Sequence, residues 1–115
     1  MRYLVQNTTW LCSELVTLLY KNGAELCETT ANLEQISRSS AVLLSDVTIT
    51  PATAIAFVAQ GYLLRGTVTS VENDDALGTF LSIELDTETQ WSPECFRPEH
   101  ALCVDAQQAM IASAA

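Results

Sequence analysis

Apolar and polar positions alternate in short runs over most of this chain, a pattern that predicts β-strands. Apolar residues dominate 10–20, and the Asn22-Gly23 dipeptide that follows is typical of a tight hairpin turn. We therefore expect 10–20 and 24–36 to form an antiparallel hairpin. A helix over 10–20 is the competing prediction, because four leucines have helical spacing there: Leu11, Leu15, Leu18 and Leu19.

Further runs of apolar or β-branched residues, bounded by turn residues, predict four more strands, at 41–45, 53–58, 62–71 and 79–85. Gln60-Gly61 and the acidic stretch 72–75 supply turns between them. Pro51 lies in the connection before 53–58. Proline has no N–H donor, and a position outside the strands needs none for the hydrogen bonds between strands. Six strands joined by short turns predict an all-β fold, a six-stranded antiparallel β-barrel or sandwich.

The C-terminal quarter has a different pattern, which predicts helix. In Trp91-Ser92-Pro93-Glu94, serine suits a helix N-cap, proline the first helical position and glutamate the first turn. Arg97-Pro98-Glu99 repeats this chemistry, and the alanine-rich 101–115 could add a final helix or fray. We expect Trp10 and Trp91 to cover the barrel ends as part of the core; an exposed aromatic patch for a partner is the alternative. The predicted organisation is a lead-in at 1–9, a barrel at 10–90 and a C-terminal helical segment at 91–115.

Composition narrows the function classes. The chain has 115 residues, which suits one domain, and 5 basic against 14 acidic residues give a formal charge of −9. Such a surface repels phosphate backbones and anionic membranes, so we expect neither nucleic-acid polymers nor membrane insertion. The start lacks the apolar region of a signal peptide, and no apolar run reaches the roughly 20 residues that cross a bilayer. A cytoplasmic protein is the resulting expectation.

The residues with catalytic or metal-binding chemistry form no recognisable motif. Four cysteines have no Cys-x-x-Cys spacing, and one histidine adds little, so free thiols are expected rather than a metal site. Cys12 and Cys27 could face each other across the hairpin, but a disulfide needs an oxidising compartment. Cys95 and His100 are the one candidate nucleophile pair, without a motif around them. We expect a protein that is not an enzyme.

A polar knuckle, Ser37-Arg38-Ser39-Ser40, separates two of the predicted strands. The order strand, Ser-x-x-small, strand resembles the second signature of PilZ domains, small bacterial β-barrels best known as cyclic di-GMP receptors. That signature, Asp/Asn-x-Ser-x-x-Gly, falls here on Gln35, Ser37 and Ser40. The resemblance covers roughly 10–100 and includes Gly66-Thr67-Val68 and the Trp-Ser-Pro-Glu segment. It implies a PilZ-like barrel.

The resemblance also implies where a ligand would bind. In nucleotide-binding PilZ members an Arg-x-x-x-Arg element before the first strand clamps guanine and phosphate with planar forked donors. Here Arg2 is the one arginine in that position, and Gln6 stands where a second could be. The implied ligand site is therefore reduced to Arg2, Gln35, Ser37, Arg38 and Ser40.

Each lost charged contact costs about 1.5–3 kcal/mol, roughly ten- to a hundredfold in affinity. We therefore expect a non-catalytic regulatory or adaptor module of bacterial signalling that binds a protein partner. Its cyclic di-GMP binding would be weak or lost, and no other cofactor is expected. The alternative is a cyclic di-GMP receptor that uses the reduced site.

Overall fold

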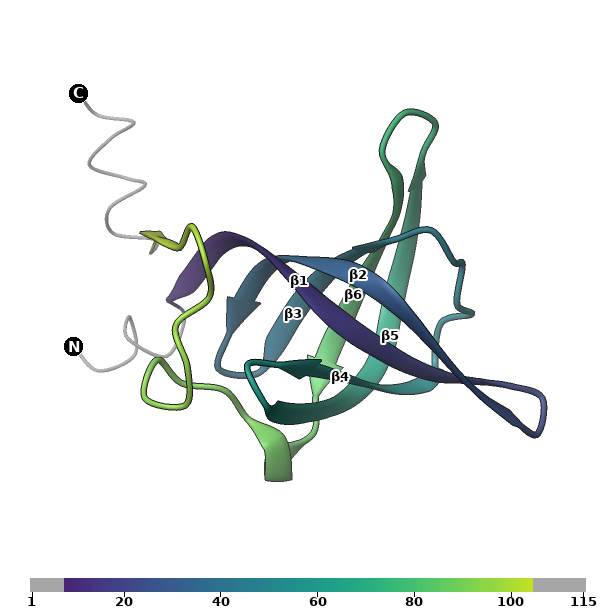
Figure 1. Ribbon diagram of the computed structural model, residues 1–115, viewed down its shortest axis with the longest axis horizontal. Coiled ribbons are helices and arrows are strands. Elements are labelled where there is room, and N and C mark those ends of the chain that lie inside the picture. Colours follow the sequence, from purple (N-terminus) through teal and green to yellow (C-terminus); the bar gives the residue numbers. More distant parts are fainter. Residues whose placement is uncertain (1–7, 105–115) are drawn as a thin grey trace.

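The computed structural model describes residues 8–104, in which six antiparallel strands close into a β-barrel (Figure 1). The sheet runs in the order β2-β3-β6-β5-β4-β1, and β1 pairs back with β2 to close it. The strands are β1 (Thr9–Asn22), β2 (Glu25–Ser37), β3 (Ser40–Ser45), β4 (Ala54–Ala59), β5 (Tyr62–Asp74) and β6 (Gly78–Leu85). The predicted six-stranded antiparallel barrel is confirmed.

The competing helix over 10–20 is wrong. β1 pairs with β2 from Thr9 to Asn22, interrupted by a register shift between Leu11 and Glu14. Beyond that shift, alternate residues of β1 face inward, and Val16 and Leu18 are buried in the core. The leucines with helical spacing thus lie on two faces of a strand, which leaves Leu15 72% exposed.

The turn between β1 and β2 lies one residue further along the chain than the Asn22-Gly23 pair predicts. Asn22 pairs with Glu25, so the two turn residues are Gly23 and Ala24. Gly23 has a φ of 67°, whereas Ala24 is not among the described residues with positive φ. A positive φ at the first turn position alone is the type II′ requirement, which glycine meets without strain. The hairpin projects from the barrel as a two-stranded ribbon (Figure 1).

The core is formed by inward-facing side chains from all six strands. The largest fully buried ones are Phe57, Leu18, Leu33, Ile36, Leu43, Leu81, Ile83 and Val68. Gly66 of β5 lies where β5 and β6 approach closely, and a Cβ there would meet the Glu84 carbonyl oxygen and lie 2.8 Å from Ile83 Cγ2. Glycine at this position is a packing requirement rather than a turn signal.

The helical segment predicted from residue 91 is not found in the described part of the chain. A 3-10 turn, η1 (Thr87–Thr89), comes earlier, and the Ser92 region forms one turn in which the Cys95 N–H donates to the Ser92 carbonyl at 2.9 Å. β7 (Leu102–Val104) then pairs with the start of β1. Residues 105–115, the rest of that prediction, lie outside the described residues.

Tertiary contacts explain this difference. Trp91 and Phe96 are 2% and 5% exposed, and both belong to the barrel core. The Trp91 indole N–H donates to the Phe96 carbonyl at 3.1 Å, which bends the chain back on itself. The unpaired edge of β1 then offers Leu102–Val104 a ladder of backbone hydrogen bonds, which replaces the bonds a helix would have made. In residues 8–104 no helix is long and apolar enough to cross a membrane.

Candidate functional site

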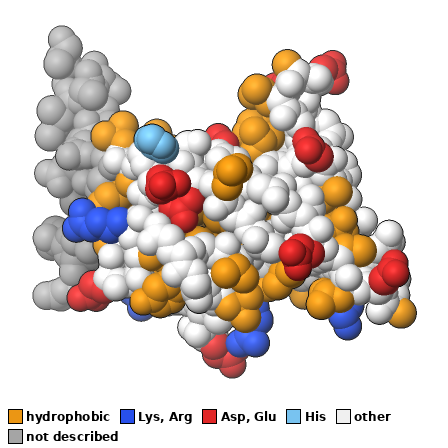
Figure 2. All heavy atoms as spheres, in the orientation of Figure 1, with side chains coloured by type: hydrophobic (Ala, Val, Ile, Leu, Met, Phe, Trp, Pro, Cys, Tyr) orange, Lys and Arg blue, Asp and Glu red, His pale blue; other side chains and the backbone are white. Residues whose placement is uncertain are grey.

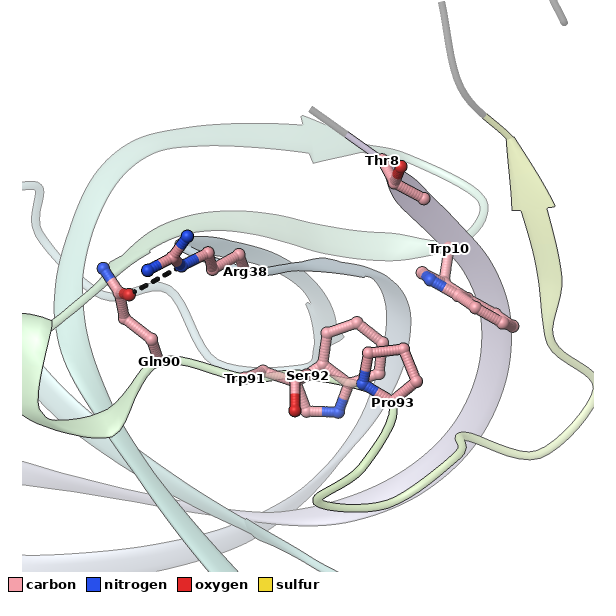
Figure 3. Close-up of a pocket in the computed structure, with 7 residues that line it drawn as sticks. All are labelled: Thr8, Trp10, Arg38, Gln90, Trp91, Ser92 and Pro93. Carbon is pink, nitrogen blue, oxygen red and sulfur yellow. Dashed lines mark hydrogen bonds between the residues drawn. The ribbon is translucent and has the colours of Figure 1, made fainter. Parts of the chain in front are cut away.

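A pocket of about 520 Å³ opens at the end of the barrel where β1 begins and β2 ends (Figure 3). Three segments that are distant in sequence form it: the start of β1, the β2–β3 turn and the chain that follows η1. Figure 3 shows Arg38 and Gln90 on one side, with Trp10 of β1 on the other side. The described residues that line it are Thr8, Trp10, Arg38, Gln90, Trp91, Ser92 and Pro93.

Arg38 is the one residue of the predicted ligand site that lines this pocket. Its Nε donates to Gln90 Oε1 at 3.0 Å, and its carbonyl accepts the Trp91 N–H at 3.0 Å. Among the described residues no carboxylate forms an ion pair with Arg38. Its guanidinium is therefore oriented by the neutral amide of Gln90, and no described carboxylate neutralises its charge.

Three other predicted site residues, Ser37, Gln35 and Ser40, do not line the pocket. Ser37 is buried, and its hydroxyl bonds the Ser40 hydroxyl at 2.6 Å, so the turn itself uses both groups. Gln35 is exposed on β2, paired with Leu11 on one side and Val42 on the other. Ser40 begins β3 and is not among the described residues with positive φ, so the turn does not require glycine there. Arg2 lies outside the described residues.

Two tryptophans give the pocket its apolar wall. Trp91 is buried in the core, whereas Trp10 is half-buried, and the rings meet edge to face with centroids 6.1 Å apart. The guanidinium carbon of Arg97 lies 5.6 Å from the centroid of the Trp10 ring, within cation–π range. Trp91 is part of the core as predicted, whereas Trp10 packs against the core and is only partly buried. Their contribution to a pocket was not predicted, because it depends on segments 80 residues apart meeting.

The buried carboxylate of Glu14 forms hydrogen bonds that link β1 to two other parts of the chain near Trp10. Glu14, which is 6% exposed, accepts the Gln60 amide at 3.0 Å and the Glu99 N–H at 2.8 Å through Oε1. The Gln60 amide also donates to the Arg97 carbonyl at 2.8 Å. These bonds keep Arg97 against Trp10 and so hold one wall of the pocket in place. From the sequence alone, Glu14 is a polar residue within an apolar strand, and no motif indicates that it forms these hydrogen bonds.

The cysteines and the histidine form no reactive site in the described part of the chain. Cys12, Cys27 and Cys95 are free thiols, and Cys27 pairs with Tyr20 across the hairpin rather than with Cys12. The Cys95 sulfur lies 3.7 Å from the Ser92 hydroxyl and makes no hydrogen bond to His100. No group of three histidine, cysteine or acidic side chains within residues 8–104 is arranged to hold a metal ion.

Cys12 is expected to be the slowest described cysteine to react. Burial, with smaller effects from Glu14 and Glu34, raises the pKa of its thiol to about 12. Since the thiolate is the reactive form, alkylation near pH 8 should be roughly three orders of magnitude slower than for a free cysteine. Timed iodoacetamide labelling followed by mass spectrometry measures this rate.

The same shift makes a prediction for stability. Because the folded state holds the Cys12 proton more tightly than the unfolded state, stability is fully present below a pH of about 8.5 and falls as pH rises toward 12. Urea unfolding at several alkaline pH values should show a smaller decline in Cys12→Ser than in the wild type. Equal declines would contradict the shift.

Charge is dispersed over the surface. In Figure 2 the acidic side chains are scattered over the visible face, and the basic ones lie apart from one another. The pocket therefore carries one described cation, Arg38, in a protein with a formal charge of −9. This arrangement can receive an apolar group beside a single negative charge. No family model, characterised protein or solved structure matches this chain.

Proposed function

We propose that this chain is a PilZ-like, non-catalytic adaptor module of bacterial cytoplasmic signalling that acts through protein contacts. One observation carries the proposal: the pocket combines an apolar wall of Trp10, Trp91 and Pro93 with a single described guanidinium, that of Arg38. A partner segment that presents a bulky apolar side chain next to a carboxylate fits both features, because the apolar group covers the indoles and the carboxylate pairs with Arg38.

The same chemistry opposes tight binding of a dinucleotide. A ligand with two phosphates and two guanines needs several charged or bidentate hydrogen-bond donors. The Arg38 Nε already donates to Gln90, so it is not free to bind such a ligand. The Ser37 hydroxyl is committed to Ser40. Relative to a site with two arginine clamps, the loss of two charged contacts weakens binding by about a hundredfold or more.

Calorimetric titration with cyclic di-GMP tests this proposal. No saturable heat is expected at nucleotide concentrations of tens of micromolar. The matched variants are Arg38→Ala, which removes the pocket cation, and Arg65→Ala, which removes an exposed cation outside it. Binding at micromolar concentration or tighter, lost in Arg38→Ala and kept in Arg65→Ala, would overturn the adaptor proposal in favour of a nucleotide receptor.

The protein-binding part of the proposal has its own test. A partner captured from the native cell is identified, produced in pure form and titrated against the same two variants without nucleotide. Arg38→Ala should weaken this complex by about tenfold or more, as expected for the loss of one charge-assisted contact, and Arg65→Ala should leave it unchanged. Equal affinities for the wild type and Arg38→Ala would contradict a role for the pocket.

A cyclic di-GMP receptor is the second candidate function. The observation that favours it is the position of Arg38, beside a pocket of about 520 Å³ at the end of β2 where the PilZ resemblance implies a ligand. That volume suits a small-molecule site, and the indoles of Trp10 and Trp91 could lie against a base. The titration above decides between the two functions.

A further inference from the structure

The outer edge of the projecting part of β2 has no partner in the described part of the chain. β3 pairs with β2 from Asn32 onward, and no backbone hydrogen bond of the described loops reaches the stretch 25–31. This free edge lies at the turn end of β1 and β2 (Figure 1), whereas the pocket lies at the opposite end of both strands, where β1 begins and β2 ends. It is therefore a separate surface.

The hairpin register shows which backbone groups point outward. Asn22 and Glu25 close the two-residue turn, so they exchange hydrogen bonds with each other. Because such bonds alternate along an antiparallel pair, and no register shift occurs from Glu14 to Asn22, Leu26 and Glu28 direct their N–H and C=O groups to the free edge. Exposed strand edges of this kind are templates for pairing with another chain.

This edge carries two charged side chains, Glu25 and Glu28, but lacks the other usual protections against such pairing. The stretch 25–31 contains no lysine, no proline and no register shift, and Leu26 is 67% exposed. The free edge of β5 beyond Val68 differs, because it has a register shift between Val68 and Ser70; the acidic residues Glu72, Asp74 and Asp75 follow this shift. Of these two edges, that of β2 has no register shift and is therefore the more open to a further strand.

We propose that two copies of this chain pair through their β2 edges, antiparallel and centred on Cys27. Other centres are less compatible with the structure. A centre on Glu28 places this carboxylate opposite its own copy, and like charges directly opposite each other are destabilising. A centre on Thr29 pairs 27–31 of the two copies and leaves the exposed Leu26 outside the interface, because a longer pairing would reach Asn32, which already pairs with β3.

The centre on Cys27 avoids both problems. Glu25 then faces Thr29 of the second copy, and Leu26 faces Glu28 of the second copy. Leu26 and Glu28 of the two copies exchange four backbone hydrogen bonds. Tyr20 and Cys27 are paired within one chain, and in the dimer Cys27 also lies opposite the Cys27 of the second copy. Five residues from each chain form a small interface, so the dimer belongs to the weak, transient class.

Thiol oxidation tests the register. Residues opposite each other at a non-hydrogen-bonded position have Cα atoms about 4.5 Å apart, within the range that a disulfide spans. Diamide accepts the two electrons and two protons released when two Cys27 thiols join. Full-length protein treated with diamide should form a dimer whose disulfide maps to Cys27, and Cys27→Ser should not form this product. Cross-linking through other cysteines alone would overturn the proposal.

Sedimentation equilibrium under reducing conditions tests the pairing itself, at protein concentrations up to about 1 mM, as a transient dimer requires. Glu28→Pro removes two of the four outward hydrogen bonds and leaves the β1–β2 ladder intact, so it should weaken the dimer about ten- to a hundredfold. Thr30→Pro is the matched control, since Thr30 lies on the same edge outside the paired residues and this change should leave the dimer unaffected.

Amide spectra establish that both proline variants fold. If Glu28→Pro does not fold, the diamide result on the wild-type chain still decides. A wild-type chain that stays monomeric throughout this concentration range and forms no Cys27 disulfide would overturn the proposal, as would equal dimerisation of the two proline variants. Neither result affects the pocket, so this inference and the proposed function can fail separately.

Discussion

Replacing Trp91 with alanine is expected to destabilise the fold by about 3–5 kcal/mol, a large part of the roughly 5–15 kcal/mol that holds a domain of this kind together. Trp91 is 2% exposed and contacts both Trp10 and Phe96 edge to face. The truncation leaves a cavity at the end of the barrel and removes the donor to the Phe96 carbonyl. Urea unfolding of the wild type and the variant measures the difference.

Trp91→Phe separates packing from hydrogen bonding. Phenylalanine keeps an aromatic ring in the core but cannot donate to the Phe96 carbonyl, so this variant should lose clearly less stability than the alanine variant. If Trp91→Ala cost under about 1 kcal/mol, the indole would not be the core element that its burial indicates. Both variants alter the pocket, so neither is suitable as a test of binding.

Gly66→Ala should be the most damaging addition of a single carbon atom to this barrel. The new methyl group would meet the Glu84 carbonyl and lie 2.8 Å from Ile83 Cγ2, and a backbone carbonyl in a paired strand cannot move aside. Overpacking of this kind costs about 1–3 kcal/mol and occasionally more. Because β5 and β6 would have to separate, amide hydrogen exchange should quicken along both strands as the free energy of unfolding falls.

Gly61→Ala is the matched control. Gly61 has a φ of 84°, and nothing lies within 4 Å of the position that its Cβ would occupy. This change therefore adds backbone strain of about 1 kcal/mol without a steric clash. If the two alanine variants proved equally stable, the close approach of β5 and β6 at Gly66 would not be the constraint.

The candidate site was only partly predictable from the sequence. Arg38 was recognised from the Ser-x-x-Ser knuckle, and it does line the pocket. Ser37 was selected by the same pattern, but its hydroxyl is used by the turn, which is a matter of rotamer and local geometry that no residue pattern specifies. Gln90 and the pocket role of Trp91 were missed because their approach to Arg38 depends on the path of the chain after β6.

The same limit explains the wrong prediction for 91–104. The Ser-Pro-Glu pattern at Ser92 is a genuine helix-start signal, and it does produce one turn. Local propensity is worth a few tenths of a kcal/mol per residue. Burial of Trp91 and Phe96 and the pairing of β7 with β1 are worth several times more, so the tertiary contacts determined the backbone.

By itself, the sequence determined the six barrel strands, their approximate ends and the all-β class, because a two-residue alternation of apolar and polar side chains lets each strand bury one face. It also determined the net charge and the lack of a metal-binding or catalytic motif. Only the tertiary structure decided that Glu14 accepts the Glu99 N–H, that Arg38 and two indoles line one pocket and that the β2 edge has no partner in the described part of the chain. Each of these depends on which segments become neighbours when the sheet closes, a long-range outcome of the whole core rather than of any local pattern.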